Sequence, residues 1–336
     1  MPSDRGTLDR RAFLRAAVAG GMAAVPLLAG CGGPPRPPQP PPGAGAHAGG
    51  ERVGPRRLCR RGPIAGGVEP SQGSTSIDAR LARGGARVLW CAAHPDDECF
   101  AGPVLARASL YHRRPLCFVV LTSGDGGECH VPGGCRPDVA TVRRREMRAV
   151  AARYGAELQH ERFWNAPLPV TSFPPRPQIA ARWRARRDPV VVVAATLVRF
   201  RPDVVLTFDP DHGATGHPEH QIASRVTTAA IRLAATGAAT LGGPPHRVAA
   251  TYYVLNRFWP LRLVGRADPG PVTERFDATL PCTPTQSCLR VMLDATRLHR
   301  SQERDMETVR TLRSAFATID LRRVDPFTEL KDPYAG

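Results

Sequence analysis

Short apolar runs recur along this chain between longer segments that have a helical period. Residues 86–93 and 115–122 are rich in branched and aromatic side chains, as is the shorter run 203–208. Their length and composition predict buried strands. Helices are predicted between or after them, at residues 98–111, 138–154, 188–200 and 217–235. This alternation predicts an α/β fold, Rossmann-like, with a mostly parallel sheet and helices on both faces.

The remaining segments add less regular predictions. A further strand is expected at 157–163 and another within 246–256, and residues 289–317 are predicted to form one long amphipathic helix. The Pro- and Arg-rich stretch 167–187 is interpreted as a surface excursion. No Gly-x-Gly-x-x-Gly follows the first strand, so dinucleotide binding is disfavoured.

Polar clusters stand where predicted strands end. The sequence His94-Pro-Asp-Asp-Glu follows the first strand, a Gly-rich loop at 123–127 follows the second, and residues 209–220 follow the strand at 203–208. Ligands of parallel α/β sheets bind beyond the carboxyl ends of the strands. We therefore expect one site that draws on all three clusters.

The residue types in these clusters suit a catalytic metal. Imidazoles and carboxylates are the nitrogen and oxygen ligands of zinc and similar divalent metals, and three protein ligands leave a position open for water. A nearby unligated carboxylate can take the water's proton, and an imidazole can stabilise an oxyanion. Taken alone, each cluster has an ordinary alternative, because an aspartate after a strand often caps a helix. The predicted site residues are His94, Asp96, Asp97, His217 and His220.

The two clusters together resemble the LmbE/PIG-L family of zinc-dependent de-N-acetylases. The likeness rests on Ala-His-Pro-Asp-Asp-Glu at 93–98 and Gly-His-Pro-Glu-His at 216–220, and it extends over roughly residues 85–315. It implies that zinc is held by His94, Asp97 and His220. It further implies that Asp96 is the general base and that His217 steadies the oxyanion or acts as an acid.

Weaker matches to the same family lie elsewhere. The loop at 121–127, the pair Arg143 and Glu146, and the late motif at 299–302 resemble its other conserved segments. The resemblance implies that Arg143 contacts substrate and that Asp209 orients part of the substrate side. Three positions depart from the family pattern, namely Glu219 for aspartate, Thr215 for the tyrosine of mycothiol-type enzymes, and Asn165 for an aspartate.

The N-terminal segment resembles an export signal. Residues 9–15 are rich in charge and contain Arg10-Arg11-Ala-Phe-Leu, and an apolar run at 16–28 ends in Leu-Ala-Gly-Cys31. The run is shorter than the ~20 residues that span a bilayer. It therefore resembles a cleaved twin-arginine signal with a lipobox, so we expect residues 1–31 to be a signal and Cys31 to carry lipid that anchors the protein to the membrane.

The rest of the chain divides by composition. Residues 32–80 are dominated by Pro and Gly and cannot bury a core, which predicts a disordered tether. Residues 81–325 hold the predicted elements and form the expected deacetylase domain. Nine cysteines are present. If Cys31 carries lipid, the other eight cysteines remain available, and an exported location permits disulfides. The pairs nearest in sequence are Cys129 with Cys135 and Cys282 with Cys288, but spacing alone does not determine the pairing.

The net charge of +16 comes almost entirely from scattered arginines. No nucleic-acid-binding motif and no aromatic stacking platform accompany them, so we expect no nucleic-acid partner. The sequence therefore predicts an exported, zinc-dependent de-N-acetylase (a hydrolase of amide bonds), acting on an acetamido sugar such as an N-acetylglucosaminyl compound. The alternative is a surface lipoprotein that binds glycans without turnover.

Overall fold

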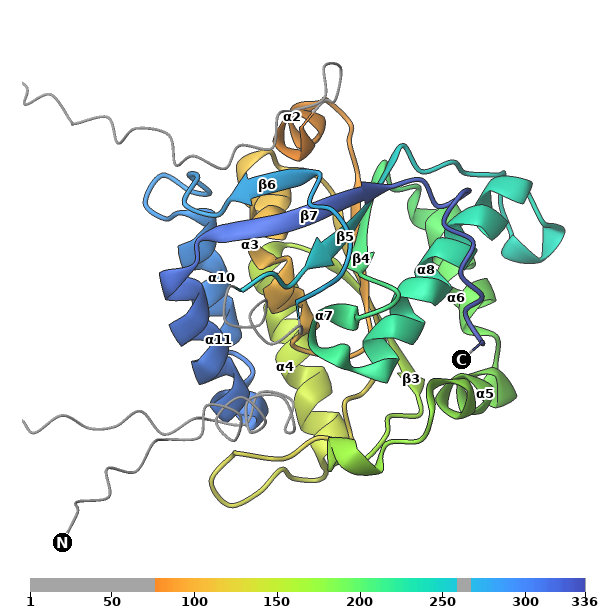
Figure 1. Ribbon diagram of the computed structural model, residues 1–336. Coiled ribbons are helices and arrows are strands. Elements are labelled where there is room, and N and C mark those ends of the chain that lie inside the picture. The colour runs from red at the N-terminus through yellow and green to blue at the C-terminus, as the bar shows by residue number, and fades with distance from the viewer. Residues whose placement is uncertain (1–75, 259–266, 336) are drawn as a thin grey trace, which may run out of the picture. The chain divides into compact units, whose positions relative to one another are not determined.

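A single seven-stranded sheet organises the computed structural model, which describes residues 76–258 and 267–335 (Figure 1). The strand order is β3-β2-β1-β4-β5-β7-β6. The strands are β1 Val88–Ala92, β2 Leu116–Thr122, β3 Glu157–Phe163, β4 Val204–Phe208, β5 Ala250–Leu255, β6 Glu274–Asp277 and β7 Thr318–Val324. The first five strands pair in parallel, whereas β7 is antiparallel to both β5 and β6.

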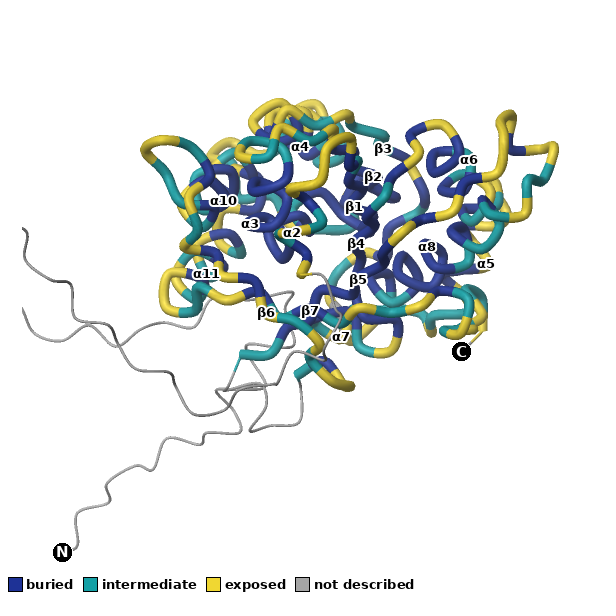
Figure 2. Tube along the Cα trace, turned by 90° about the horizontal axis from the view of Figure 1, so that it is seen from above, coloured by how far each residue is buried: buried dark blue, intermediate teal, exposed yellow. Residues whose placement is uncertain are grey.

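Helices cover both faces of this sheet, as Figure 2 shows from above. The longer helices are α4 Val139–Tyr154, α5 Arg176–Arg186, α6 Pro189–Phe200, α8 Pro218–Thr236, α10 Cys288–Thr296 and α11 Glu303–Ala315. The shorter ones are α2 Ile77–Ala82, α3 Gly102–Ala106 and α7 Gly213–Gly216, with single turns η1 Asp97–Phe100, η2 Arg107–Tyr111, η3 Val170–Ser172, η4 Ala239–Leu241 and η5 Arg300–Gln302.

The two faces of β1 show why both layers are needed. All five residues of the strand are buried. Val88 and Trp90 pack in the core beneath α3, α4, α10 and α11, whereas Leu89 and Cys91 pack in the core beneath α5, α6 and α8. A strand with apolar side chains on both faces requires cover on both sides. The predicted α/β architecture with a mostly parallel sheet is confirmed.

Local signals set the helix ends that sequence patterns predicted. Asp138 begins α4 by accepting the backbone N–H of Thr141 at 2.7 Å, and α4 ends at Gly155, whose φ of +61° is left-handed. Asp188 caps α6 by accepting the N–H of Val190 at 2.8 Å. Among the described residues, no helix is both long and apolar enough to cross a membrane.

The predicted long helix over residues 289–317 is wrong, because the chain breaks between α10 and α11. His299 has φ −82° and ψ 60°, outside the helical region. Its Nε2 lies 2.8 Å from Glu98 Oε1, and Ser301 bonds Glu146. The break therefore lets this turn exchange helical hydrogen bonds for hydrogen bonds to the buried Glu98 and the half-buried Glu146.

Two further predictions need correction. The stretch 167–187 is not only a surface excursion, because its second half forms α5, which buries Ile179, Ala180 and Trp183. The antiparallel strands β6 and β7 were not predicted. β6 buries only Phe276, and β7 buries only Ile319 and Leu321, so neither has the continuous apolar run that marks β1, β2 and β4.

The predicted signal and most of the predicted tether, residues 1–75, lie outside the described residues. Of the two cysteine pairs nearest in sequence, Cys129–Cys135 is a disulfide, whereas Cys282 and Cys288 are free thiols. The thiol of Cys288 donates to Pro281 O at 3.7 Å.

Candidate metal centre

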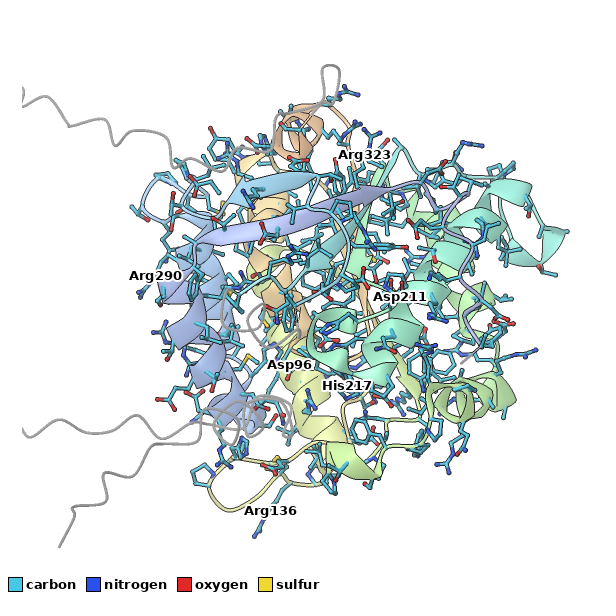
Figure 3. All side chains as sticks on the ribbon, in the orientation of Figure 1. Asp96, Arg136, Asp211, His217, Arg290 and Arg323 are labelled. Carbon is cyan, nitrogen blue, oxygen red and sulfur yellow. A yellow bond between two sulfur atoms is a disulfide. The ribbon has the colours of Figure 1, made fainter. Side chains whose placement is uncertain are left out.

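The predicted site residues come together because β1 and β4 are neighbours in the sheet. The register pairs Val88 with Val204 and Trp90 with Leu206, so the carboxyl ends of these strands lie side by side. The turn after β1 carries Asp96, and the loop after β4 leads to His217 at the start of α8. Both residues line one cavity, and both are labelled in Figure 3.

Three imidazoles and one carboxylate form the centre of this site. The ligand atoms of His94, His217 and His220 all lie within 4.8 Å of one another. A closer set includes Asp97. In this set His94 Nδ1 lies 3.1 Å from His220 Nε2. Asp97 Oδ1 lies 3.0 Å from His220 Nε2, and Asp97 Oδ2 lies 3.6 Å from His94 Nδ1.

This closer set has the spacing that zinc needs. Tetrahedral zinc with bonds of ~2.0–2.1 Å places neighbouring ligand atoms about 3.3 Å apart. The 3.1 Å between His94 Nδ1 and His220 Nε2 and the 3.0 Å between His220 Nε2 and Asp97 Oδ1 are both close to that value. The three residues predicted as ligands therefore fit zinc by donor type and spacing, while His217 lies beside them.

Asp97 is held in place by the backbone that precedes it. Its Oδ2 accepts the N–H groups of Ala93 at 3.0 Å and His94 at 2.8 Å, and its Oδ1 faces His220. Burial raises the pKa of this carboxyl, but the imidazoles of His220 and His94 outweigh burial and hold the pKa well below its usual range. A permanently ionised carboxylate is the form that binds metal.

Glu219 fixes the ring of His94 from behind. The Glu219 side chain is fully buried, and its Oε2 lies 2.5 Å from His94 Nε2. It also accepts Asn165 Nδ2 at 2.6 Å and the N–H of Ala166 at 2.8 Å. A carboxylate on the outer nitrogen of a ligand histidine sets the ring's orientation and tautomer. The result is that His94 Nδ1 points to the centre.

Asp96 is the unligated carboxylate of the site. Its φ is +96°, in the left-handed region that non-glycine residues rarely adopt, and its N–H donates to Glu98 Oε2 at 3.1 Å. Arg143 Nη2 donates to Asp96 Oδ2 at 2.9 Å. Burial raises the pKa of Asp96, although Arg143 opposes the rise. This strained turn presents a carboxylate with raised basicity to the cavity.

His217 presents a neutral imidazole to the same cavity. Its Nδ1 accepts the N–H of Glu219 at 3.2 Å, which caps α8. Burial, followed by the neighbouring His94 and His220, holds the pKa of His217 well below its usual range. A neutral ring that accepts at Nδ1 carries its proton on Nε2 and can donate it to an oxygen.

Arg143 lies on the cavity wall, but its bonds go to protein. It is only 4% exposed and donates to Gly124 O at 2.8 Å, to Pro95 O at 2.6 Å and to Asp96. Gly124 has φ +66°, and a Cβ there would lie 2.4 Å from the Arg143 guanidinium. Arg143, predicted to contact substrate, therefore links the loop at Gly124 and the turn at Pro95 to the carboxylate of Asp96.

Asp209, the other residue predicted on the substrate side, does not line the cavity. It is fully buried, accepts the N–H groups of Asp211 and His212, each at 2.9 Å, and accepts Arg322 Nη2 at 2.5 Å. These bonds shape the loop that leads to His217. Asp209 therefore acts as a loop anchor.

Two residues that shape this loop were missed by sequence reasoning. Asp268 Oδ1 accepts the N–H of Ala214 at 2.9 Å, and Asn256 Nδ2 donates to Ala214 O at 2.9 Å. Ala214 has φ +59°, so both bonds hold a left-handed alanine just before His217. Neither residue belongs to a motif, and the only available signal was polar residues following an apolar strand.

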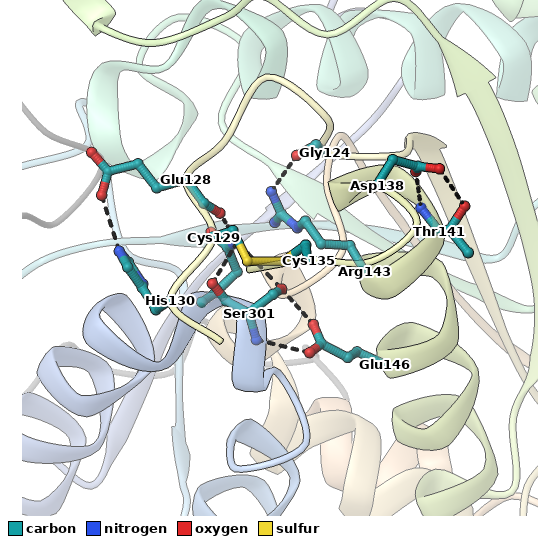
Figure 4. Close-up of a disulfide and its surroundings, with 11 residues drawn as sticks. Gly124, Glu128, Cys129, His130, Cys135, Asp138, Thr141, Arg143, Glu146 and Ser301 are labelled. Atoms are coloured by element: carbon teal, nitrogen blue, oxygen red, sulfur yellow. Dashed lines mark hydrogen bonds and ion pairs between the residues drawn. A yellow bond between two sulfur atoms is a disulfide. The ribbon is translucent and has the colours of Figure 1, made fainter. Parts of the chain in front are cut away.

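The C-terminal elements close the site from the other side. Ser301 donates through its N–H to Glu146 at 2.8 Å and through its hydroxyl at 2.6 Å. Gln302 Nε2 donates to Glu128 O at 2.7 Å, and the disulfide Cys129–Cys135 lies in that same loop (Figure 4). The loop after β2 is thus fastened to η5 and becomes a cavity wall.

The cavity itself measures about 160 Å³. Besides the metal-site residues, Arg143 and Asn165, its lining comprises Cys99, Phe100, Gly126, Gly127, Glu128, Ala166, Leu168, Phe173, Thr215, Gln302, Arg304, Asp305, Met306 and Val309. Charged groups and apolar groups are both present. The site can therefore combine a polar substrate part with an apolar one.

Comparison with known proteins adds the following. A family model described as GlcNAc-PI de-N-acetylase (PIG-L) matches residues 89–231. The 1D-myo-inositol 2-acetamido-2-deoxy-alpha-D-glucopyranoside deacetylase of Thermobifida fusca is 30% identical over 56% of this chain and 69% of its own. The protein of the same name from Rhodococcus opacus is 31% identical over 50% of this chain. Its match spans only 61% of that relative's length.

Solved structures show the fold. A 4-carboxy-2-hydroxymuconate hydratase from Pseudomonas putida KT2440 aligns over 74% of this chain and 98% of its own. The N,N'-diacetylchitobiose deacetylase of Pyrococcus horikoshii aligns over 75% and 88%. Each has a TM-score of 0.52 and 17% identity. One is a hydratase and the other a deacetylase, so the shared fold alone does not select a reaction.

Proposed function

Because the chain belongs to the PIG-L family of GlcNAc-PI de-N-acetylases, we propose that it is a zinc-dependent hydrolase that removes the acyl group from the amide of an acetamido sugar. The observation that carries the proposal is the close set of His94, Asp97 and His220 beside an unligated Asp96. The acetamido sugars named in the relatives' descriptions support the substrate class.

The metal fits the donors that this chain provides. Zinc held by His94, Asp97 and His220 supplies Lewis acidity toward water and the amide carbonyl. Glu219 keeps the His94 ring oriented, and the backbone bonds to Asp97 leave one of its oxygens free for coordination. Another divalent transition metal with the same ligand preference would also fit.

Asp96 and His217 carry the proton chemistry. Arg143 fixes one oxygen of Asp96, and the other accepts a proton from the attacking water. His217 donates its Nε2 proton as a hydrogen bond to the carbonyl oxygen of the amide, where negative charge develops. Asp96 then returns its proton to the nitrogen as the C–N bond breaks. The products are an amine and a carboxylic acid, and proton exchange between them gives the ammonium and carboxylate ions.

The location proposed for this reaction is outside the cytoplasm. The twin-arginine-like leader and Cys31 motivate export and lipid anchoring, with the part of the predicted tether that precedes α2 as the link to the catalytic domain. The Cys129–Cys135 disulfide supports this location, because such bonds persist in oxidising compartments.

The test combines metal content with turnover. Purified protein is expected to hold close to one zinc per chain and to release acetate from N-acetylglucosamine-containing compounds. Asp96→Asn should retain zinc and lose at least a hundredfold in kcat, whereas Asp211→Asn, a matched change outside the cavity, should retain activity. Absence of turnover together with unchanged glycan affinity in Asp96→Asn would instead favour the glycan-binding alternative.

A further inference from the structure

The cavity has an apolar side that the proposed chemistry does not use. Cys99 and Phe100 contribute to it from η1, and Met306 and Val309 contribute from α11. All four side chains are buried. Cys99 and Phe100 lie in the same turn as Asp97, and the ring centroid of Phe100 is 6.5 Å from that of His220.

This wall continues away from the metal. A second, small cavity of about 10 Å³ is lined by Phe258, Leu312 and Arg313 together with Cys99, Phe100 and Val309. The last three line both cavities. Arg313 is the one charged residue in that lining. Its Nη1 donates to Thr318 O at 3.2 Å, and its guanidinium stacks over the ring of Phe258. Cys99, Phe100 and Val309 therefore form an apolar wall that borders both the cavity at the metal centre and this smaller one.

The lining along α11 changes from polar to apolar. Arg304 and Asp305 in its first turn face the cavity, and Met306 and Val309 follow. Glu128 adds another polar group at the cavity. Sugar hydroxyls can find partners among these charged groups but not along Met306 and Val309, where they would lose hydrogen bonds to water.

We propose that the site accepts N-acyl groups longer than acetyl, with the acyl chain lying against Phe100, Met306 and Val309. The proposal rests on the amide hydrolysis proposed above and names its substrate class as amphiphilic N-acyl amino sugars. An acetyl group adds one methyl beyond the carbonyl and leaves most of this apolar wall uncovered. Each buried methylene of a longer chain favours binding up to about fourfold.

A chain-length series tests the proposal. Glucosamine carrying N-acetyl, N-butanoyl, N-hexanoyl or N-octanoyl groups is offered to the zinc-loaded full-length protein, and amine release gives kcat/KM for each. We expect kcat/KM to rise with chain length, by tenfold or more from acetyl to hexanoyl. A maximum at acetyl would overturn the inference while leaving the hydrolase proposal intact.

Direct binding separates the two proposals if no compound is hydrolysed. That result would defeat the hydrolase proposal, and calorimetry with the same compounds would then decide the inference. Tighter binding of N-octanoyl- than of N-acetylglucosamine supports the apolar subsite, and equal or weaker binding removes it.

Substitution of Val309 locates the effect. Val309→Trp places a larger side chain on the apolar wall, and Val309→Thr keeps the shape of the side chain but adds a hydroxyl. Both should lower the octanoyl-to-acetyl ratio of kcat/KM, or of binding constants, by about tenfold. Val191→Thr, on the exposed side of α6, is the matched control. If Val309→Trp does not fold, Val309→Thr alone decides, and an unchanged ratio contradicts the assignment.

Discussion

At the scale of single residues, the contact between Asn165 and Glu219 links two separate departures from the family pattern. Sequence comparison treats Asn165 and Glu219 as unrelated differences. The structure brings them to 2.6 Å, with the amide of Asn165 donating to the carboxylate that orients His94. An aspartate at 165 would instead face a buried carboxylate. The amide therefore suits the longer acid at 219.

Replacing Asn165 by aspartate should damage this contact. Asn165→Asp places two acids together in a buried site, and we expect zinc affinity to fall 10–100-fold and stability to fall by about 3 kcal/mol. Chelator competition and urea unfolding measure the two effects. Adding Glu219→Gln should recover part of both losses, because the glutamine amide can donate to the introduced carboxylate. Wild-type behaviour of Asn165→Asp would contradict the assigned role.

Asp305 gives a pH-dependent prediction at the same scale. Burial, followed by the charge of Asp96, raises the pKa of Asp305 to about 7. Between about pH 4 and pH 7 the unfolded chain therefore releases this proton while the folded chain keeps it, so the group lowers stability as pH rises through that window. Asp305→Asn removes the effect. Its Tm should exceed that of wild type by more at pH 8 than at pH 5, and an equal difference at both pH values would contradict the prediction.

At the scale of elements, the packing of α3 against α10 depends on one glycine. A Cβ on Gly102 would lie 2.3 Å from Met292 Cγ and 2.9 Å from the hydroxyl of Tyr154, both fully buried residues. No such contact exists at Gly84, where a Cβ meets nothing within 4 Å. The two glycines are therefore a matched pair.

Gly102→Ala is expected to lower the free energy of unfolding by about 1–3 kcal/mol, because the core must shift to admit the methyl. Gly84→Ala should stay within about 0.5 kcal/mol of wild type. Urea unfolding followed by circular dichroism measures both. Equal stability of the two variants would show that α3 and α10 separate without penalty.

The parallel strands and most helices could be predicted from the sequence because their signals are local. Apolar runs mark buried strands, and Asp138 with Gly155 marks the ends of α4. The break at His299 could not be predicted, since its cause is a carboxylate 201 residues away. The same holds for Asp268, whose role depends on Ala214 in another loop. Local pattern carries no information about such partners.

The residues at the centre of the candidate site could also be predicted from the sequence. His94, Asp96, Asp97, His217 and His220 stand in two compact motifs, and adjacent parallel strands bring them together. Arg143 and Asp209 were assigned to substrate, but their bonds go to site loops. The residue types of Arg143 and Asp209 indicated a charged group near the site at each of these positions. Only the fold shows whether that charge faces substrate or backbone.

At the scale of the whole molecule, the proposed export route gives a separate prediction. Replacing Arg10 and Arg11 with lysines keeps the charge but removes the twin-arginine pair, so the protein should accumulate in the cytoplasm. Cys31→Ser should allow export but release the protein from the membrane fraction. Cell fractionation with immunoblotting distinguishes the outcomes, and unchanged distribution of both variants would refute the leader assignment.

The pairing of β1 with β4 has a consequence for the newly made chain. His94 and His220 are 126 residues apart, so at ribosomal rates His220 emerges roughly 6–25 s after His94. During that interval β1 lacks its second neighbour, and only His94 and Asp97 of the three proposed ligands have been made. A metal ion that reaches the chain in this interval finds an incomplete binding site. We therefore expect metal to bind only after β4 and α8 have left the ribosome.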